Sequence, residues 1–286
     1  MAATTKGPEN DMPPINNSFA RSVRLRRLYR HDDERLLVIP MDHSVTDGSI
    51  SGGERLNRTV AALSGAGADA VVLHKGALRY VDGAAFADMS LIVHLSAGTT
   101  RAPDPDLKYL VTSVEEAVRL GADAVSVHVN LGADAESRQI VDLAEVARAC
   151  DAWNVPLLAM MYPRGPRISD PRDPELIAHA VALAVDLGAD IVKTVAPATA
   201  AELRDVTRGC PVPVIVAGGP LRESAAELAA FTEQVLAGGA AGVAMGRNIF
   251  LHDDPGAAAR QVCQIVHRPV LAVPAGAAGR LEPSVA

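Results

Sequence analysis

The chain has 286 residues, of which 27 are basic and 34 acidic, so its net charge is −7. That length suits one large α/β domain or two small ones, and the acidic balance argues against a nucleic-acid-binding protein. No apolar stretch approaches the roughly 18 residues of a membrane span, no secretory signal is evident, and three widely spaced cysteines are typical of a reducing compartment. A cytoplasmic protein is predicted.

The first elements expected in chain order are a flexible N-terminus over residues 1–17 and a short helical leader over residues 18–31. The leader is rich in arginine, and acidic residues follow it at once. This charge pattern favours a solvated helix face or a subunit contact over a site for a phosphate backbone. The arginines are Arg21, Arg24, Arg26, Arg27 and Arg30.

From Leu36 onward, short β-branched runs alternate with longer amphipathic ones. The predicted strands are Leu36–Met41, Ala70–His74, Leu91–Leu95, Ala124–Val129, Pro156–Met161, Ile191–Val195, Val212–Ala217 and Gly242–Met245. The predicted helices are Glu54–Ser64, Ser113–Leu120, Glu136–Trp153, Pro174–Leu187, Ala200–Cys210, Glu223–Ala237 and Pro255–His267.

Eight strands, nearly all followed by a helix, predict an α/β fold: a single (β/α)8 (TIM) barrel over residues 18–267, with a loose C-terminal tail over 268–286. Only about fifteen residues separate the second and third strands, so the helix there should be short or irregular. The alternative, an open doubly wound sheet, usually has a glycine-rich turn after its first strand. Here that strand runs into Asp42-His43-Ser44 instead.

A weak internal repeat joins helices to strands at four places: Gly67-Ala68-Asp69-Ala70, Gly121-Ala122-Asp123-Ala124, Gly188-Ala189-Asp190-Ile191 and Gly239-Ala240-Ala241-Gly242. Glycine can adopt the left-handed conformation that ends a helix. The small alanine then lets the chain turn tightly into the barrel. The repeat therefore indicates structure and carries no chemistry.

Polar residues follow almost every predicted strand, whereas the strands themselves are apolar. In (β/α)8 enzymes the active site lies at this C-terminal face. The strand ends read Met41-Asp42-His43, His74-Lys75-Gly76, His94-Leu95-Ser96, His128-Val129-Asn130, Tyr162-Pro163-Arg164, Lys193-Thr194, Gly218-Gly219-Pro220 and Gly246-Arg247-Asn248.

Lys193 is the first candidate for chemistry, because it stands in the apolar run 189–195. A charged amine in a buried strand is costly unless it is paired, so burial favours the neutral form. A neutral amine can attack a carbonyl carbon and form a Schiff base. The alternative is a lysine at a strand end that reaches solvent or an ion-pair partner.

Two glycine-containing pairs, Gly218-Gly219 and Gly246-Arg247, follow the seventh and eighth strands. Barrels of this kind commonly hold a phosphate there. Glycines let backbone N–H groups approach phosphate oxygens, and Arg247 can add a charge-assisted hydrogen bond. We therefore favour a phosphate site over the alternative that these glycines only make tight turns.

Asp42 and Tyr162 end the first and fifth strands. A carboxylate can move protons during Schiff-base formation, and a phenol can exchange a proton with a hydroxyl as a carbon–carbon bond breaks. The alternatives are a helix cap or an arginine partner for Asp42 and a rim position for Tyr162. Lys75 is a competing amine that can instead bind an anionic substrate group.

Four histidines also end strands and raise the alternative of a metal-dependent hydrolase: His43, His74, His94 and His128. The sequence has no HxH pair among them, and one histidine on each of four strands need not converge on a point. Lone histidines are usually hydrogen-bonded structural groups. No metal site is therefore expected.

The chain resembles the class I aldolase family of 2-amino-3,7-dideoxy-D-threo-hept-6-ulosonate synthase and 2-amino-4,5-dihydroxy-6-oxo-7-(phosphooxy)heptanoate synthase. The resemblance runs from about Val38 to His267 and is specific to the family, though not to one substrate. It is carried by PMDHSVTDG (40–48), VVLHKG (71–76), IVHLSAGT (92–99), GADAVSVHVN (121–130), MMYPRG (160–165), GADIVKT (188–194), VAGGP (216–220) and GVAMGRNIFLHDDP (242–255).

The resemblance implies that Lys193 forms the Schiff base, that Tyr162 donates a proton and that Asp42 is a general acid/base. It further implies substrate contacts by Asp42, His43, Ser44, Val45 and Thr46, by Tyr162, Pro163 and Arg164, and by Gly218, Gly219, Gly246 and Arg247. We add Lys75 to the expected substrate contacts.

The implied reaction joins a phosphorylated ketose, dihydroxyacetone phosphate or a related donor, to aspartate semialdehyde. Its product, a seven-carbon amino keto acid, is a precursor of aminohydroxybenzoate-like metabolites. No metal or organic cofactor is expected, because the lysine itself supplies the electron sink. Three alternatives stay open: the hept-6-ulosonate synthase reaction of aromatic amino-acid synthesis, a fructose-bisphosphate-type aldolase, and a catalytically silent barrel that binds a sugar phosphate.

One segment departs from the family pattern. Val195-Ala196-Pro197-Ala198 stands where relatives often carry a more polar, glycine-containing stretch, and this bears on the acceptor pocket. Relatives form rings of many subunits, so a homo-oligomer is expected, with the leader and the tail as contacts.

Overall fold

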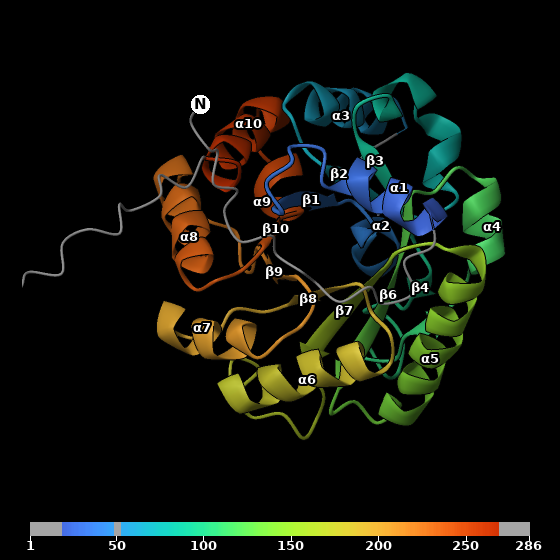
Figure 1. The fold of residues 1–286 in the computed structure, drawn as a ribbon, viewed down its shortest axis with the longest axis vertical. Helices are drawn as coiled ribbons and strands as arrows, with labels where there is room; N and C mark the ends of the chain where they lie inside the picture. Colours follow the sequence, from blue (N-terminus) through green and yellow to red (C-terminus); the bar gives the residue numbers. More distant parts are fainter. Residues whose placement is uncertain (1–18, 49–52, 269–286) are drawn as a thin grey trace, which may run out of the picture.

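The computed structural model describes residues 19–48 and 53–268, which form a ring of helices around a barrel of strands (Figure 1). The barrel strands are β1 (Leu36–Pro40), β2 (Ala70–Leu73), β3 (Ser90–His94), β6 (Ala124–Leu131), β7 (Leu157–Pro163), β8 (Ile191–Thr194), β9 (Val214–Ala217) and β10 (Gly242–Ala244). The short strands β4 (Ser96–Ala97) and β5 (Tyr109–Leu110) form a separate antiparallel pair.

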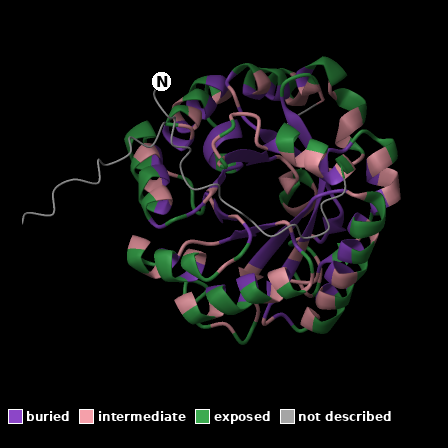
Figure 2. Ribbon diagram, viewed as in Figure 1, coloured by how far each residue is buried: buried purple, intermediate pink, exposed green. Residues whose placement is uncertain are grey.

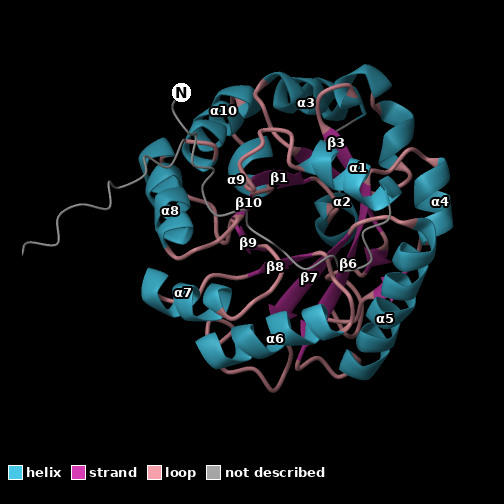
Figure 3. Ribbon diagram, viewed as in Figure 1, coloured by secondary structure: helices cyan, strands magenta, loops and turns pink. Residues whose placement is uncertain are grey.

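The helices are α1 (Phe19–Leu28), α2 (His43–Asp47), α3 (Gly53–Gly65), α4 (Val114–Arg119), α5 (Glu136–Trp153), α6 (Pro174–Asp186), α7 (Ala200–Arg208), α8 (Ala225–Ala237), α9 (Arg247–Phe250) and α10 (Pro255–Val266). Figure 3 shows that they surround the strands on all sides of the barrel. In the part of the chain that the structure describes, no helix combines the length and the apolar character needed to cross a lipid bilayer.

The barrel strands pair in parallel and follow one another in chain order, and β1 closes the sheet by pairing with both β2 and β10. The predicted (β/α)8 barrel is thereby confirmed. Two 3₁₀ turns, Ala77–Tyr80 and Gly83–Phe86, replace a full helix between β2 and β3, as the short spacing predicted. The interpretations of residues 1–17 as flexible and of the tail beyond Arg268 lie outside the described residues.

The four-residue repeat ends helices as predicted, since its glycines have φ between 80° and 95°. The aspartates of the repeat have a further structural role. Asp69, Asp123 and Asp190 each precede a strand and accept the backbone N–H of Leu37, Leu91 and Leu157, respectively, at 2.6 to 2.9 Å. The three repeats that contain an aspartate therefore link the start of one strand to the strand before it.

The leader helix α1 covers the N-terminal opening of the barrel. Leu28 is fully buried and packs with the apolar side chains of the barrel interior. Arg21 is 2% exposed, and its guanidinium pairs with Asp190 at 3.0 Å and Asp151 at 2.9 Å. The expectation of a solvated face or a subunit contact is wrong for Arg21, because Arg21 forms buried ion pairs with acidic residues of the same chain.

Alternate residues along each strand point into the barrel. The inward residues near the strand starts are apolar and buried, and include Val72, Ile92, Met160 and Ile191. Figure 2 shows this buried interior inside helices whose outer faces are exposed. Because the period is two, the next inward positions are polar: His74, His94, Tyr162 and Lys193. The alternation along the strands therefore places a layer of polar side chains directly above the apolar interior, at the C-terminal ends of the strands.

Candidate active site

A cavity of about 1070 Å³ opens at the C-terminal ends of the barrel strands. Residues at or just beyond the ends of all eight strands line it, among them Asp42, His74, His94, His128, Tyr162, Lys193, Ala217 and Ala244. The volume suits a ligand of sugar-phosphate size or larger. The cavity lies where the sequence predicted an active site.

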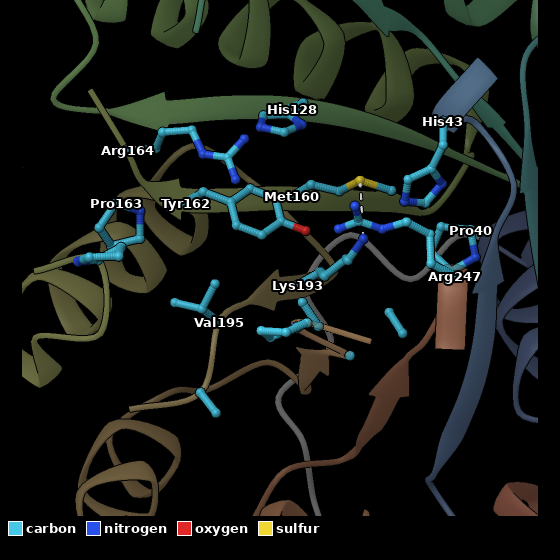
Figure 4. A pocket seen from close by; sticks show the side chains of 18 of the residues that line it. Pro40, His43, His128, Met160, Tyr162, Pro163, Arg164, Lys193, Val195 and Arg247 are labelled. Carbon is cyan, nitrogen blue, oxygen red and sulfur yellow. Dashed lines mark hydrogen bonds between the residues drawn. The ribbon is translucent and has the colours of Figure 1, made fainter. Parts of the chain in front are cut away.

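Lys193 lies in β8 between Met160 of β7 and Ile215 of β9, and it is only 6% exposed. Its Nζ is 3.8 Å from the Met160 sulfur and 5.8 Å from the centre of the Tyr162 ring (Figure 4). Within residues 19–48 and 53–268, no carboxylate forms an ion pair with it. The structure therefore presents a buried amine at the wall of a cavity, with no carboxylate at ion-pair distance among the described residues.

Asp42 precedes α2 but does not cap it. Its carboxylate lies 3.7 Å from His94 Nε2 and 3.6 Å from His43 Nδ1. Burial alone would raise the pKa of Asp42, but its electrostatic interactions with His94, His43, Lys193 and His74 lower it overall. Asp42 Oδ1 has no hydrogen-bond partner among the described residues. A buried, ionised oxygen without a donor is suited to accept a proton or a hydrogen bond from a bound substrate.

The histidines around Asp42 are uncharged at neutral pH. Burial lowers the pKa of His43 and His74, and it lowers that of His94 to about 4 although Asp42 acts in the opposite direction. His94 Nδ1 lies 2.8 Å from the Ser126 hydroxyl, so both of its ring nitrogens have polar neighbours. His43 Nδ1 has no hydrogen-bond partner among the described residues, so it is available to a bound substrate.

We expect His94 to make the stability of the protein depend on pH. Its folded pKa of about 4 lies below the unfolded value of 6.5, so the unfolded chain binds more protons between these values. The variant His94→Asn keeps a hydrogen-bond partner for Ser126 and cannot titrate. Between about pH 7.5 and about pH 5, the stability advantage of the wild type over this variant should fall by about 2 kcal/mol. Urea unfolding at both pH values measures the change, and a constant difference would contradict it.

Tyr162 lies inside β7 and is held against the ring of His128, 4.8 Å away. Asn130 donates its side-chain amide to the Asp106 carbonyl at 2.8 Å, so its Oδ1 accepts from His128 Nε2 at 2.8 Å. Burial lowers the pKa of His128 well below its usual range, so the ring is neutral and its proton is on Nε2. This chain of contacts fixes the plane on which the Tyr162 ring rests.

The glycine-containing pairs lie side by side at the cavity wall, as β9 and β10 are neighbours. Gly219 has φ +69°, and a Cβ on Gly246 would lie 2.5 Å from the Pro40 carbonyl oxygen, so both positions require glycine. Asn248 links the two turns by donating to the carbonyls of Gly218 and Pro220. With these carbonyls engaged and Arg247 in the lining, the wall can receive a phosphate group.

Not every predicted residue reaches the cavity. Lys75 does not line it, since its ammonium pairs with both Glu116 carboxylate oxygens at 3.0 and 3.1 Å. His43 and Thr46 do line it, but Ser44 and Val45 do not. The reason is that residues three apart in α2 share one face while the two between them point elsewhere. The lining also contains Pro163, Arg164, Gly218, Gly219, Gly246 and Arg247.

Three cationic residues that were not predicted also line the cavity: Lys108, Arg172 and Arg222. Arg172 donates to the carbonyls of Ala196 and Pro197 at 3.2 and 2.7 Å, and so holds the stretch that departs from the family pattern. Arg222 stacks on Phe231, with 3.7 Å between its guanidinium carbon and the ring centre. None of the three stands directly after a strand, so the strand-end pattern could not identify them.

A buried lysine that shares a cavity with a carboxylate and a phenol at the C-terminal face of a barrel is the arrangement of an aldolase that works through a Schiff base. The sequence matches the DeoC/LacD family aldolases over residues 36–252, and the chain belongs to this family. It is a class I aldolase, and therefore a carbon–carbon lyase.

Among similar proteins, the 2-amino-4,5-dihydroxy-6-oxo-7-(phosphonooxy)heptanoate synthase of Streptomyces griseus is 57% identical over 267 residues, covering 92% of this chain and 97% of the relative. The 2-amino-3,7-dideoxy-D-threo-hept-6-ulosonate synthase 1 of Archaeoglobus fulgidus is 42% identical, covering 85% and 90%.

The fold is also similar to solved structures of archaeal fructose 1,6-bisphosphate aldolases. One crystal structure has a TM-score of 0.78 and 29% identity, covering 87% of this chain and 99% of the other. A second, with a TM-score of 0.77, 28% identity and the same coverage, has its catalytic lysine covalently bound to the carbinolamine intermediate of the substrate. A lysine adduct thus exists on the same fold in a related enzyme.

Proposed function

We propose that this aldolase joins dihydroxyacetone phosphate to aspartate semialdehyde and releases a seven-carbon amino keto acid phosphate. The observation that carries the proposal is the 57% identity to the Streptomyces griseus heptanoate synthase over nearly the whole of both chains. The name of that relative's product fits this pair of substrates. A three-carbon ketose phosphate supplies the 7-phosphate, the 6-ketone and the 5-hydroxyl, and a four-carbon amino aldehyde supplies the rest.

In this proposal the donor phosphate binds at Gly218, Gly219, Gly246 and Arg247. Backbone N–H groups and one guanidinium suit a phosphate dianion. His43 and Thr46 contact the donor from α2, the helix that follows β1, and β1 is the neighbour of β10 in the barrel. The donor ketone then faces Lys193, which opens on the same cavity.

The reaction starts when the Lys193 amine attacks the donor ketone carbon. Loss of water leaves an iminium, which is a stronger electron sink than the ketone. Asp42, ionised and with an oxygen that lacks a partner, moves the protons of this step and removes one from the donor carbon beside the iminium. The result is an enamine held on the enzyme.

The enamine carbon then attacks the aldehyde carbon and forms the new carbon–carbon bond. Tyr162 donates a proton to the aldehyde oxygen as that oxygen becomes a hydroxyl. Water adds to the resulting iminium, releases the product ketone and restores Lys193. Tyr162 is suited to this role because its ring lies between Lys193 and Arg164, with 5.8 Å to the amine and 5.9 Å to the guanidinium carbon.

The proposal also includes a cytoplasmic location and a homo-oligomer, as expected from the composition and the resemblance. Lys75 is not part of the proposed site, because Glu116 holds its ammonium outside the cavity.

A product assay tests the substrates. We expect the protein to consume dihydroxyacetone phosphate and aspartate semialdehyde one for one and to form a product whose mass is their sum. Glyceraldehyde 3-phosphate and a deoxy-ketohexose phosphate donor serve as the alternative arms. Formation of fructose 1,6-bisphosphate at a higher rate, or reaction only with the deoxy-ketohexose phosphate, would overturn the proposed substrates in favour of the two related activities.

A further inference from the structure

Lys108 is a buried cation in the cavity wall that the mechanism above does not use. It immediately precedes β5, is 6% exposed and lines the cavity. Its Nζ donates to the Pro105 carbonyl at 3.2 Å, and in residues 19–48 and 53–268 no carboxylate forms an ion pair with it. Asp106, Asp104 and Asp47 act on its charge only from beyond ion-pair distance. A buried ammonium without a direct ion pair is costly, so a bound anion would stabilise it.

The surroundings hold Lys108 in place. Its Nζ lies 2.9 Å from the position that a Cβ on Gly98 would occupy, so the side chain passes over that glycine. The loop before it is anchored because the Asp106 carbonyl accepts from the buried amides of Asn130 at 2.8 Å and Gln139 at 3.1 Å. A cation positioned in this way loses little conformational freedom when an anion binds.

Arg164 provides a second positive charge on the same side of the cavity. It follows β7, and its guanidinium carbon lies 5.9 Å from the centre of the Tyr162 ring. Burial and then the charge of Arg164 lower the pKa of Lys108, and Asp106, Asp104 and Asp47 only partly offset this lowering, so the two cations are near enough to repel each other. An anion between them would relieve this repulsion.

This pair of cations lies across the barrel from the phosphate wall. Arg247 follows β10, which in the closed sheet stands opposite β6, and Lys108 lies in the segment between β3 and β6. Figure 4 shows Arg164 on one side of the Tyr162 ring, whereas Arg247 enters the cavity from the other side and extends toward Lys193. A substrate that bridges both sides must therefore carry a negative group at each end.

We propose that Lys108 and Arg164 form an anion subsite that binds the carboxylate of the acceptor aldehyde and so selects acceptors that carry a carboxylate. The inference rests on the proposed function, in which the donor phosphate occupies the wall near Arg247. The aldehyde carbon must reach the enamine on Lys193, so the far end of the acceptor points away from the donor phosphate. That direction leads past Tyr162 to Lys108 and Arg164.

Kinetics with paired acceptors test this subsite. With dihydroxyacetone phosphate held constant, Lys108→Met should lower kcat/KM for aspartate semialdehyde by about 10- to 100-fold, the scale of one charged hydrogen bond. For butanal, a neutral aldehyde of the same chain length, kcat/KM should change by less than about twofold. An equal loss with both aldehydes, or no loss with either, would overturn the subsite.

Two arginines of one loop form a matched pair that does not depend on a buried position. Arg164→Gln should also lower kcat/KM for aspartate semialdehyde more than kcat/KM for butanal. Arg167→Gln should not, because Arg167 is exposed, pairs with Asp134 at 3.9 Å and does not line the cavity. Equal effects of the two variants would attribute the selectivity to general surface charge and reject the subsite.

Two further measurements separate the possible failures. Glyceraldehyde 3-phosphate tests whether the subsite prefers an acceptor phosphate to an acceptor carboxylate. If the protein uses this aldehyde in preference to aspartate semialdehyde, the subsite does not select a carboxylate. Borohydride trapping of dihydroxyacetone phosphate should be unchanged in Lys108→Met. If the wild type itself forms no trapped adduct, the proposed function fails, whatever the acceptor results are.

Discussion

Lys193→Met should lower kcat by on the order of 10⁴-fold or more, the scale seen when other enzymes lose a covalent nucleophile. Methionine matches the length of lysine and fits the apolar contacts of β7 and β8, so the fold should be retained. The variant has no amine and cannot form the iminium. Steady-state assays with dihydroxyacetone phosphate and aspartate semialdehyde measure the loss.

Two other variants sharpen this result. Lys193→Arg should also be inactive while partly retaining phosphate-ligand binding, because a guanidinium stays protonated and cannot attack a ketone. Lys75→Met should keep its turnover, since Lys75 pairs with Glu116 outside the cavity. Turnover that survives in Lys193→Met and disappears in Lys75→Met would assign the Schiff base to the competing amine.

Asp42→Asn should lower kcat by about 10²- to 10⁴-fold, the usual range for a lost general acid/base. The amide has the same shape as the carboxylate, but it cannot take up a proton. Because the pKa of Asp42 is lowered, the wild-type carboxylate remains ionised throughout the neutral range. The loss should therefore be nearly constant between about pH 6 and about pH 8.

The control for this variant is Asp47→Asn, which removes one negative charge about a turn further along the chain. Its kcat should fall much less than that of Asp42→Asn, because Asp47 lines the cavity but is exposed at the end of α2. Comparable losses in both variants would mean that Asp42 acts only through the overall charge of this region. A loss confined to Asp42→Asn supports its role in moving protons.

Much of the site could be predicted because the strand pattern carries three-dimensional information. Ile191 points into the barrel, so Lys193, two residues later, does so as well. The same rule explains the position of Lys75. Leu73 packs between the barrel and the helices. Lys75 is two residues later and faces the same way, so the sequence alone could have excluded Lys75 from the cavity.

Other features depend on contacts that no local pattern records. Lys108 stands in an irregular segment between β3 and β6, and Asn130 and Gln139 anchor the loop that places it at the cavity. The segment 43–46 was predicted to contact substrate as a run, but it forms a helix that turns Ser44 and Val45 away. The ties from Arg21 to Asp151 and Asp190 join residues more than 100 positions apart.

The most direct test of the account is reduction with borohydride in the presence of dihydroxyacetone phosphate, followed by peptide mass spectrometry. Borohydride reduces an iminium to a stable secondary amine, so the modified lysine identifies itself. We expect one adduct per chain, on the peptide that contains Lys193, and none in Lys193→Met. An adduct on Lys75 or Lys108, or no adduct under conditions of full turnover, would contradict the assignment of Lys193 as the Schiff-base lysine.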